Sequence, residues 1–494
     1  MKTAGRLWQR AAGWVQEDFR AAGAHLSALR SPAPAPGLYP YRCETPAGQV
    51  RLHLRLHPDR SALLFINAVE AIHLSPTAAE IAKYALDGLS RPAALARLRA
   101  SYPRVPALDL AADYDRLVAV VARLREPAEC CHVCDLGLAQ PPPFSVRATA
   151  PYKADLALTY ACNNACAHCY NESPRGAGFL ARPGSPTPPK ARAGKPAPRE
   201  PLTDLPSSAW RVILDKLLTI GVPYVIFTGG EPTLREDLPA LVAYAESLGM
   251  ICGLNTNGRR LSDPALCRAL AEAGLDHVQI TLNSTRPEVH DRLSGAPAWA
   301  ETVAGIRQAV AAGLHVLTNT TLLHENAAEA SELPAFLHGL GVRTFAMNGL
   351  IHSGCGAGHD GALPPADLRT VLAQVRPRAT DLGMRFLWYT PTRYCQLDPV
   401  AAGLGLKSCN AAEYSICVEP NGDVLPCQSY YQPAGNLLRD PWESIWEGDL
   451  FRKLRYRREK PNRAGLPSEC WECEQLPLCG GGCMLTRSRP GGAG

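Results

Sequence analysis

Three cysteines follow directly on an apolar, strand-like stretch of this 494-residue chain. Cys162, Cys166 and Cys169 have the spacing CxxxCxxC within the sequence DLALTYACNNACAHCY. Iron–sulfur clusters are held by cysteine thiolates, usually four of them, so three thiolates in one loop leave one iron of a four-iron cluster open. A zinc site would pair CxxC with a second CxxC or with two histidines, and His168 and Cys252 stand at no such spacing. The triad therefore predicts an iron–sulfur site at the end of a strand.

A repeated pattern of strand-like runs and helical segments follows the triad. The runs end in short polar segments at Thr228–Pro232, Asn255–Gly258, Thr281–Ser284, Thr318–Thr320 and Met347–Asn348. Helical patterns such as Pro264–Ala273 and Trp299–Ala312 lie between them, and such βα repeats predict a parallel sheet. Six units fit an incomplete (β/α)6 TIM-type barrel. Active sites of such barrels lie at the carboxyl ends of the strands, where the triad and the polar segments fall.

The triad, together with the sequence TGGEP that begins at Thr228, resembles the radical S-adenosylmethionine (SAM) family. The resemblance implies that the three catalytic cysteines bind a 4Fe-4S cluster whose open iron is chelated by SAM. Two glycines let a backbone approach a ligand closely, and Glu231 is similar to the family's acceptor for the SAM amino group. An ordinary strand-to-helix turn, and helix capping by the asparagines, are the alternatives. The residues predicted to bind SAM are Gly229, Gly230, Glu231, Asn255, Asn283 and Asn319.

A second group of cysteines closes the chain. Its members are Cys409, Cys417 and Cys427, followed by Cys470, Cys473, Cys479 and Cys483 in the spacing CxxCx5Cx3C. This pattern resembles the SPASM domain, an auxiliary-cluster module found after radical SAM cores that modify peptides. The resemblance implies a first auxiliary cluster held by Cys409, Cys417, Cys427 and Cys483. It implies a second one held by Cys470, Cys473 and Cys479. A zinc ribbon is the alternative for this group.

The second auxiliary cluster lacks an obvious fourth ligand. SPASM domains usually carry a further cysteine downstream, whereas residues 484–494 contain none. Either the cluster takes a ligand from elsewhere, with Cys395 as the leading candidate, or one iron is open to water or a substrate group. We favour the open iron, because Cys395 also fits a buried structural cysteine. Cys130, Cys131 and Cys134 form a further group, CCHVC, which suits local structure or a distant source of the missing ligand.

The first 150 residues show a different pattern. Arg51–Leu56 and Ser61–Ile66 are predicted strands, and helical patterns follow through Leu108–Leu124. The stretch His73–Leu89 resembles the winged-helix-like PqqD-type domain, which binds leader peptides of ribosomally made, post-translationally modified peptides (RiPPs). Such domains add the peptide to a sheet edge, and we expect Ser61–Ile66 and Leu108–Leu124 to form that groove. A winged DNA-binding domain is the alternative, although the segment has no concentrated Lys/Arg face.

These features divide the chain into predicted domains: 1–36 N-terminal amphipathic helix and linker, 37–128 PqqD-like domain, 129–150 linker with CCxxC, 151–350 radical SAM core with a disordered insertion at 174–201, 351–408 bridging region, and 409–494 SPASM domain. The net charge of +5 gives no argument for nucleic acid, and the basic run Arg452–Lys460 is expected to be a solvated helix face. No run approaches the roughly 18 apolar residues of a membrane span. The chain shows no signal peptide, so we expect a cytoplasmic protein with reduced thiols.

The resemblance as a whole implies an α/β radical SAM/SPASM peptide maturase. The implied reaction is hydrogen abstraction from a precursor peptide with a leader sequence by a 5′-deoxyadenosyl radical, with a flavodoxin or ferredoxin as electron donor. A haem-modifying or sulfatase-maturing SPASM enzyme is one alternative. Sulfatase maturases carry an aspartate after the cysteine at 427, where this chain has Gln428. A noncatalytic iron–sulfur or zinc scaffold that binds peptide is the alternative from another class.

Overall fold

The computed structural model describes residues 33–45, 48–126, 131–171 and 202–488. The predicted N-terminal amphipathic helix and the predicted insertion at 174–201 lie outside these residues. The chain divides into two compact units, residues 1–142 and 143–494. The boundary falls inside the segment 129–150 that the sequence predicted as a linker.

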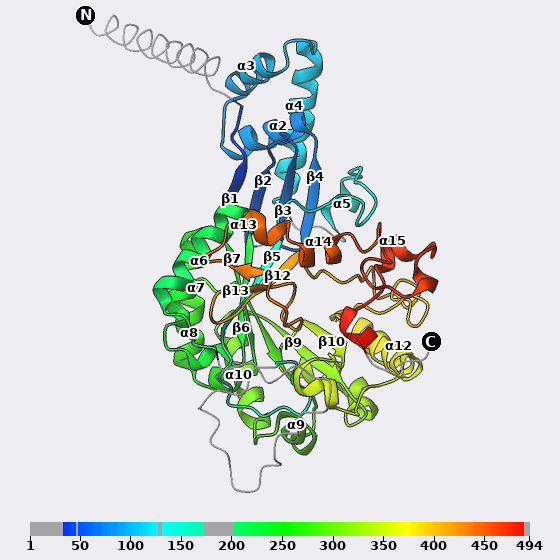
Figure 1. The fold of residues 1–494 in the computed structure, drawn as a ribbon. Coiled ribbons are helices and arrows are strands. Elements are labelled where there is room, and N and C mark those ends of the chain that lie inside the picture. The colour runs from blue at the N-terminus through cyan, green and yellow to red at the C-terminus, as the bar shows by residue number, and fades with distance from the viewer. Residues whose placement is uncertain (1–32, 46–47, 127–130, 172–201, 489–494) are drawn as a thin grey trace, which may run out of the picture. The chain divides into compact units, whose positions relative to one another are not determined.

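The N-terminal unit contains a four-stranded antiparallel sheet in the order β1-β2-β3-β4 (Figure 1). Its strands are β1 (Gly37–Thr45), β2 (Gly48–Leu56), β3 (Ala62–Ile66) and β4 (Glu70–Leu74). The two predicted strands are confirmed as the central pair. The expectation that Ser61–Ile66 offers an open edge is wrong, because β3 is paired with β2 on one side and β4 on the other. Only an edge strand has unpaired backbone groups for an added peptide, and the edges here are β1 and β4.

Helices pack on this sheet. They are α2 (Pro76–Leu86), α3 (Arg91–Ser101), α4 (Ala107–Arg123) and the short α5 (His132–Asp135). The predicted start of α2 is confirmed: Ser75 is its N-cap, and its side chain accepts a hydrogen bond of 3.4 Å from the amide of Ala78. Leu52, Leu54 and Leu64 lie in the sheet core and are at most 1% exposed.

The segment after α4 is fastened to the edge strand β4. The amide of His73 donates a hydrogen bond of 2.8 Å to the side chain of Gln140. The backbone amide of His132 donates to Oε2 of Glu70 at 2.9 Å. The ring Nδ1 of His132 lies 2.9 Å from Oε1 of the same carboxylate. Part of the β4 edge is therefore occupied by the chain itself.

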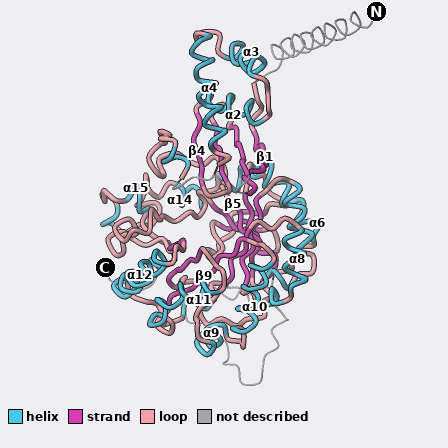
Figure 2. The backbone as a smooth tube through the Cα atoms, turned by 180° about the vertical axis from the view of Figure 1, so that it is seen from behind, coloured by secondary structure: helices cyan, strands magenta, loops and turns pink. Residues whose placement is uncertain are grey.

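The C-terminal unit is built on a sheet in the order β11-β10-β9-β8-β7-β6-β5-β12-β13-β14 (Figures 1 and 2). The strands are β5 (Lys153–Thr159), β6 (Tyr224–Gly229), β7 (Ile251–Thr256), β8 (His277–Thr281), β9 (His315–Leu322), β10 (Thr344–Gly349), β11 (Arg385–Trp388), β12 (Ser415–Val418), β13 (Asp423–Leu425) and β14 (Gly435–Asn436). Strands β5 to β11 pair in parallel, which confirms the six predicted units and adds β11. Strand β12 pairs in parallel with β5, so the C-terminal cysteine segment extends the same sheet.

Helices cover the outer face of this sheet (Figure 2). The longer ones are α6 (Ser207–Ile220), α7 (Leu238–Ser247), α8 (Pro264–Glu272), α9 (Pro287–Ser294), α10 (Trp299–Ala311), α11 (Leu333–Gly339) and α12 (Pro365–Asp381). The short helices α13 (Trp442–Trp446), α14 (Asp449–Arg455) and α15 (Leu476–Cys479) belong to the C-terminal segment. Trp210, Phe227 and Phe345 are fully buried between strands and helices, and burying such a side chain stabilises the fold by roughly 1.5–3 kcal/mol.

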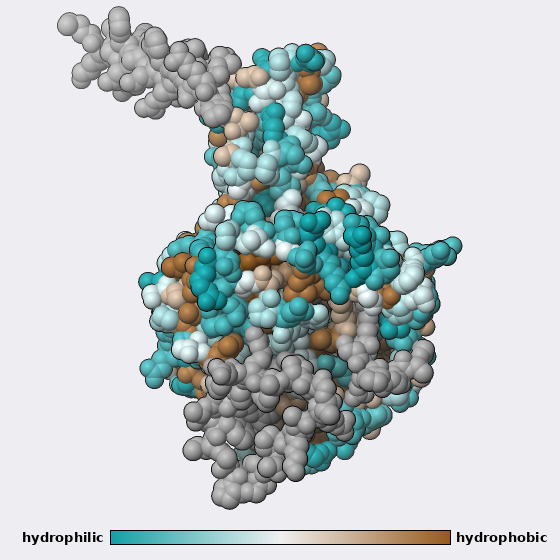
Figure 3. Space-filling view, viewed as in Figure 1, coloured by the Kyte–Doolittle hydropathy of each residue, from teal (hydrophilic) through white to brown (hydrophobic). Residues whose placement is uncertain are grey.

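In the view of Figure 3 the described surface of the C-terminal unit is mostly hydrophilic, with separate hydrophobic patches. No helix in the described part of the chain is both long and apolar enough to cross a membrane.

Candidate iron–sulfur sites

The cysteine triad lies in the loop that follows β5, at the carboxyl end of the parallel sheet. Strand β5 ends at Thr159, and the residues Cys162, Cys166 and Cys169 are all partly exposed. The amide of Cys169 donates to the carbonyl oxygen of Cys166 at 3.3 Å, which folds the second half of the loop into a turn. The structure thus brings the triad to the place that the sequence predicted, and its binding of a cluster stays a prediction.

Gly229 and Gly230 at the end of β6 allow the triad loop to approach very closely. A Cβ atom on Gly229, whose φ is +138°, would lie 2.1 Å from the carbonyl oxygen of Thr159. A Cβ atom on Gly230 would lie 2.4 Å from that of Ala161. The amides of Gly230 and Glu231 donate to these two oxygens at 2.7 and 2.8 Å. The close approach that glycine permits is therefore made by the chain itself, and direct contact of these glycines with SAM stays a prediction.

Glu231 is fully buried and joins the ends of β6 and β7. Its Oε1 accepts hydrogen bonds from the amide and hydroxyl of Thr233 at 3.1 and 2.6 Å and from the hydroxyl of Thr256 at 2.7 Å. Its Oε2 accepts one from the amide of Asn257 at 2.8 Å. Burial raises the pKa of Glu231, and these hydrogen bonds oppose that rise. A carboxylate oxygen accepts about two hydrogen bonds, so Oε2 can take a further donor such as an ammonium group.

Asn257 and Arg259, which were not among the predicted site residues, hold the first half of the triad loop. The side-chain amide of Asn257 donates to the side chain of Asn163 at 2.6 Å. The guanidinium of Arg259 donates to the backbone of Asn163 and, at 3.1 Å, to the side chain of Asn164. An ion pair with Glu301 orients this guanidinium. The sequence signal for this role was a basic residue, Arg259, directly after the polar segment at the end of β7.

The end of α9 supports the middle of the loop. The amide of Ala165 donates to the carbonyl oxygen of Ser294 at 2.8 Å. Gly295 ends the helix with a φ of 63°, and a Cβ atom there would lie 2.4 Å from the carbonyl oxygen of Ala165. A left-handed glycine is the usual helix end, and here it also makes room for the cysteine loop.

The short helix η4 (Gly354–Gly358) packs against the end of the loop. The amide of Gly356 donates to the carbonyl oxygen of Cys169 at 3.0 Å, and a Cβ atom on Gly354 would lie 2.3 Å from the carbonyl oxygen of Asn171. Cys355 stands between these glycines, so a fourth cysteine lies beside the triad loop. Cys355 belongs to no cysteine motif, so the sequence did not predict that it lies beside the triad loop.

Two of the three asparagines predicted to face SAM carry buried polar atoms that lack a hydrogen-bond partner. Among the described residues, Nδ2 of Asn283 and Oδ1 of Asn319 have none. Leaving such a group unpaired costs about 1–3 kcal/mol, so these atoms fit a polar ligand at the carboxyl ends of the strands. Asn255 is partly exposed on β7. None of the three is the N-cap of the helix that follows it, so the capping alternative is wrong.

Four cysteines of the C-terminal group are predicted to hold the first auxiliary cluster. Burial raises the pKa of Cys427, and the neighbouring Cys409 and Cys483 raise it further. Cys417 lies on β12 opposite Asp155 and is 1% exposed. Burial raises its pKa too, with Asp155 and Cys427 among the further causes. Cys409, Cys417 and Cys483 are therefore near enough to Cys427 for their charges to interact with its thiol, and their joint binding of one cluster stays a prediction.

Hydrogen bonds join the triad loop to the segment after Cys427. The hydroxyl of Tyr170 donates to the side chain of Gln428 at 3.3 Å. The hydroxyl of Tyr431 donates to the side chain of Asn171 at 3.0 Å. Asn171 in turn donates to the carbonyl oxygen of Gly229 at 3.1 Å. The loop of the triad and the first auxiliary set thus lie side by side.

The basic run Arg452–Lys460 was expected to be a solvated helix face, and this is wrong for its centre. Arg455 is 5% and Arg457 1% exposed. The guanidinium of Arg457 donates to Glu413 at 2.8 Å and to the carbonyl oxygen of Cys409. Arg458 donates to the same carboxylate at 2.9 Å. Buried charges need partners, and here the partner lies about 40 residues upstream, next to a predicted ligand.

The second auxiliary set lies on short helical turns. Cys470 ends η5 (Ser468–Cys470), Cys473 follows in the loop, and Cys479 ends α15. Cys395, which was expected to be a buried structural cysteine, is exposed, so that expectation is wrong. Within the described residues, no three His, Cys, Asp or Glu side chains are close enough to hold a single metal ion. Ligands of a four-iron cluster each bind a different iron, so they can lie further apart than the ligands of one zinc ion.

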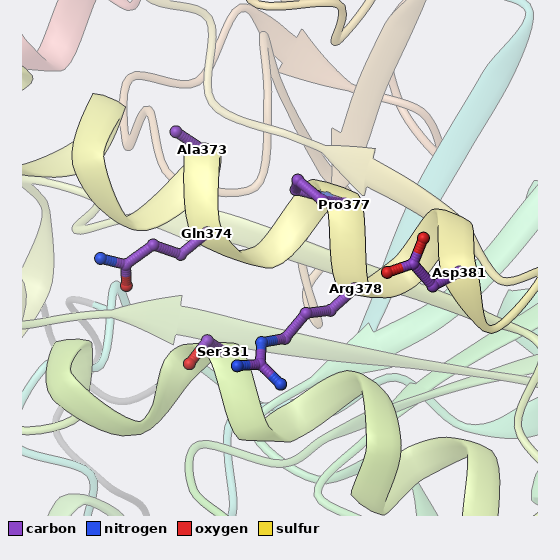
Figure 4. A pocket seen from close by; sticks show the side chains of 6 residues that line it. All are labelled: Ser331, Ala373, Gln374, Pro377, Arg378 and Asp381. Atoms are coloured by element: carbon purple, nitrogen blue, oxygen red, sulfur yellow. The ribbon is translucent and has the colours of Figure 1, made fainter.

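A surface hollow between η3 (Ala327–Glu332) and α12 lies apart from these groups (Figure 4). It holds none of the predicted site residues. Its lining consists of Ser331, Ala373, Gln374, Pro377, Arg378 and Asp381.

Family models match two parts of the chain. Residues 156–337 match the radical SAM superfamily, and residues 409–474 match an iron–sulfur cluster-binding domain, SPASM. The first match spans the triad and all residues predicted to contact SAM. The second covers the C-terminal cysteines as far as Cys473.

Curated relatives and solved structures extend these matches. The PqqA peptide cyclase of Xanthomonas oryzae is 30% identical over 357 residues, which is 69% of this chain and 83% of that protein. The mycofactocin maturase MftC of Mycobacterium tuberculosis is 30% identical over 347 residues, 68% of this chain and 79% of that one. The crystal structure of Streptococcus suis SuiB bound to the precursor peptide SuiA has a similar fold, with a TM-score of 0.61, 16% identity and coverage of 91% of this chain and 96% of that one.

Proposed function

The chain belongs to the radical SAM superfamily and carries a SPASM iron–sulfur domain, and from this premise we propose that it modifies a ribosomally synthesised precursor peptide. Family membership makes it an enzyme that uses SAM, a 4Fe-4S cluster and auxiliary iron–sulfur clusters. The observation that carries the proposal is the accessible triad at the carboxyl end of β5 beside the cysteines of the SPASM segment. The relatives named above are a PqqA peptide cyclase and a mycofactocin maturase, and the first of these names supports a peptide substrate.

The residues present fit these groups. Cys162, Cys166 and Cys169 would hold the SAM-binding cluster. SAM bound at such a cluster supplies, on reduction, a 5′-deoxyadenosyl radical that abstracts hydrogen. The carboxylate of Glu231 would accept from the SAM amino group through its free position on Oε2. The unpaired amide atoms of Asn283 and Asn319 would bind further polar atoms of SAM.

The remaining work of the protein is orientation. Hydrogen abstraction requires the target carbon to be held close to the 5′ carbon of SAM, because only a positioned reactant gains the rate of an intramolecular step. The triad loop is tied to Gly230, Arg259, Ser294 and Gly356, so the site has a fixed geometry before a peptide arrives. The chemistry itself belongs to the cofactor.

The N-terminal unit would recognise the leader of the precursor. Its sheet and helices agree with a peptide-binding module that accepts a strand at a sheet edge. Because β3 is internal and Gln140 occupies part of the β4 edge, the edge of β1 is the better candidate for the added strand. A reduced flavodoxin or ferredoxin would supply the electron, and a cytoplasmic location would keep the thiols reduced.

Gln428 argues against a sulfatase-maturing reaction. Sulfatase maturases have an aspartate at this position that acts as a base, and the neutral amide of a glutamine cannot take that role. The side-chain oxygen of Gln428 accepts a hydrogen bond of 3.3 Å from the hydroxyl of Tyr170.

An isotope experiment tests the proposal. A short peptide encoded beside the gene would be made with deuterated side chains and incubated anaerobically with SAM, reductant and the enzyme. We expect deuterium in 5′-deoxyadenosine together with a mass change in the peptide. A variant without residues 1–142 should still cleave SAM but bind the peptide with a raised Kd. Failure of every such peptide to transfer deuterium, with SAM cleavage intact, would contradict a peptide substrate.

A further inference from the structure

The edge strand β4 of the N-terminal unit is covered by a segment of the same chain (Figure 1). We call residues 132–140 the latch segment; it consists of α5 and residues 136–140. An edge strand presents unpaired backbone amides and carbonyl oxygens, to which a further strand can be added. The contacts of the latch segment therefore decide whether β4 is open to a peptide.

The latch segment begins with a charged contact to the first residue of β4. The backbone amide of His132 and its ring Nδ1 each lie 2.9 Å from an oxygen of the Glu70 carboxylate. The ring Nε2 lies 2.8 Å from the carbonyl oxygen of Glu126. An ionised carboxylate and a carbonyl oxygen only accept hydrogen bonds, so both ring nitrogens donate and the ring is positively charged. His132 is 9% exposed, and such charge-assisted hydrogen bonds are roughly twice as strong as neutral ones.

Apolar side chains hold the middle of the latch segment. Val133, Leu136 and Leu138 pack against the buried cluster of the sheet, which includes Leu124 at the end of α4. From residue 136 to residue 140 the side chains are alternately partly buried and exposed. This alternation is typical of an extended strand with one face turned inward, so this part of the segment resembles a bound peptide.

The last residue of the latch segment binds the backbone of β4. The amide of His73 donates a hydrogen bond of 2.8 Å to the side-chain oxygen of Gln140. In an antiparallel edge strand, alternate residues direct their amide and carbonyl groups outward, where an added strand would pair with them. The side-chain oxygen of Gln140 therefore stands where a backbone carbonyl oxygen of an added peptide would stand.

We propose that the latch segment is an internal ligand of the β4 edge, and that a peptide strand can be added there only after the segment is released. The covered surface fits an extended peptide with a basic side chain opposite Glu70 and apolar side chains four and six residues further on. The inference concerns the N-terminal unit alone and does not rest on the radical chemistry. A closed β4 edge leaves β1 as the edge for the precursor.

A segment that is covalently attached competes strongly with a free peptide. Its effective concentration at its own site is of the order of millimolar. A free peptide that makes the same contacts should therefore bind the wild-type protein weakly. Release of the segment should raise the affinity of that peptide without any new contact.

Binding of a synthetic peptide tests the proposal. The probe is a fluorescein-labelled peptide with the sequence of residues 132–142, in which serine replaces the cysteine. The release variant is the full-length chain with His132→Ala, Leu138→Ser and Gln140→Ala, and it keeps Glu70 and His73. We expect its Kd for the probe to be at least about tenfold lower than that of the wild type, as measured by fluorescence anisotropy. Equal Kd values, or no binding to a release variant whose circular dichroism is unchanged, would overturn the proposal.

Two controls assign the binding to the β4 edge. Adding Glu70→Gln to the release variant removes the charged partner of the probe and should raise the Kd again. A probe of the same composition in scrambled order should bind neither protein, and equal binding of the two probes would also overturn the proposal.

A single substitution answers the question if the release variant does not fold. Gln140→Ala removes one hydrogen bond of the latch segment and should still lower the Kd for the probe. Gln49→Ala, at an exposed glutamine of β2, should leave that Kd unchanged. The same Kd in Gln140→Ala and in Gln49→Ala would contradict the proposed role of the latch segment.

Discussion

Tyr170 donates a hydrogen bond of 3.3 Å to Gln428, and each of these residues directly follows a predicted cluster ligand. The contact spans two regions of the chain that the sequence treats as separate domains. Strand β12 also pairs in parallel with β5, the strand that carries the triad loop. The SPASM segment therefore packs directly against the strand and loop that carry the predicted SAM site.

A chain that ends at residue 408 tests this dependence. It lacks β12, so β5 becomes an edge strand with unpaired backbone groups, and the hydrogen bonds of Tyr170 with Gln428 and of Asn171 with Tyr431 are lost. We expect this variant to bind less iron at the triad than the full chain with its auxiliary cysteines replaced by alanine. Equal triad iron and equal SAM cleavage in the two proteins would show that the core stands alone.

Gly230 tests the close approach to the triad loop. In Gly230→Ala the added Cβ atom would lie 2.4 Å from a backbone oxygen, and such overpacking costs about 1–3 kcal/mol. We expect a lower midpoint in urea and less triad iron. The control is Gly339→Ala in α11, where a Cβ atom meets nothing within 4 Å. Similar effects of the two substitutions would argue against the tight contact.

The buried pair of Arg457 and Glu413 tests the support of the first auxiliary set. In Glu413→Gln two guanidinium groups lose their charged partner, and breaking a buried pair costs about 3–5 kcal/mol. We expect a large loss of stability and weaker binding of the first auxiliary cluster. Glu459→Gln removes an exposed partner of Arg147 in the same unit and should change unfolding little. Chemical denaturation of the two variants checks this prediction. A small loss of stability in both variants would contradict it.

His290 makes stability depend on pH. It is 1% exposed, and burial lowers its pKa from 6.5 to about 4, while Asp291 raises it slightly. Its Nδ1 accepts a hydrogen bond of 3.2 Å from the amide of Asn283, which requires the neutral ring. The contribution of the neutral His290 ring to the free energy of unfolding is present above pH 6.5 and is lost as the pH falls toward about 4. The total loss is of the order of 3 kcal/mol. His290→Asn keeps an acceptor without the charge, so its thermal midpoint should fall less over this range than that of the wild type.

The parallel βα repeats and the place of the triad followed from the sequence, because the apolar runs and their polar ends repeat along the chain. The position of a strand within a sheet did not follow. Ser61–Ile66 was expected at an edge, whereas the five residues of β4 form a further strand beyond it.

Contacts between distant segments account for the other differences. The run Arg452–Lys460 looks like a solvated face until Glu413 is placed beside it. The glycine at 354 is explained by the backbone of Asn171, and the glycine at 356 lies against the backbone of Ile351 and donates to Cys169. Cys395 likewise shows its exposure and its neighbours only in the folded chain. Local spacing identifies such residues, and the fold supplies their partners.

The most direct test of the central claim is SAM cleavage by a variant with alanine at Cys162, Cys166 and Cys169. Reduced, reconstituted wild-type protein should form 5′-deoxyadenosine from SAM, and the variant should form none while it keeps the iron of the auxiliary clusters. Formation of 5′-deoxyadenosine by the variant at the wild-type rate would contradict the assignment of the triad as the SAM-cluster site.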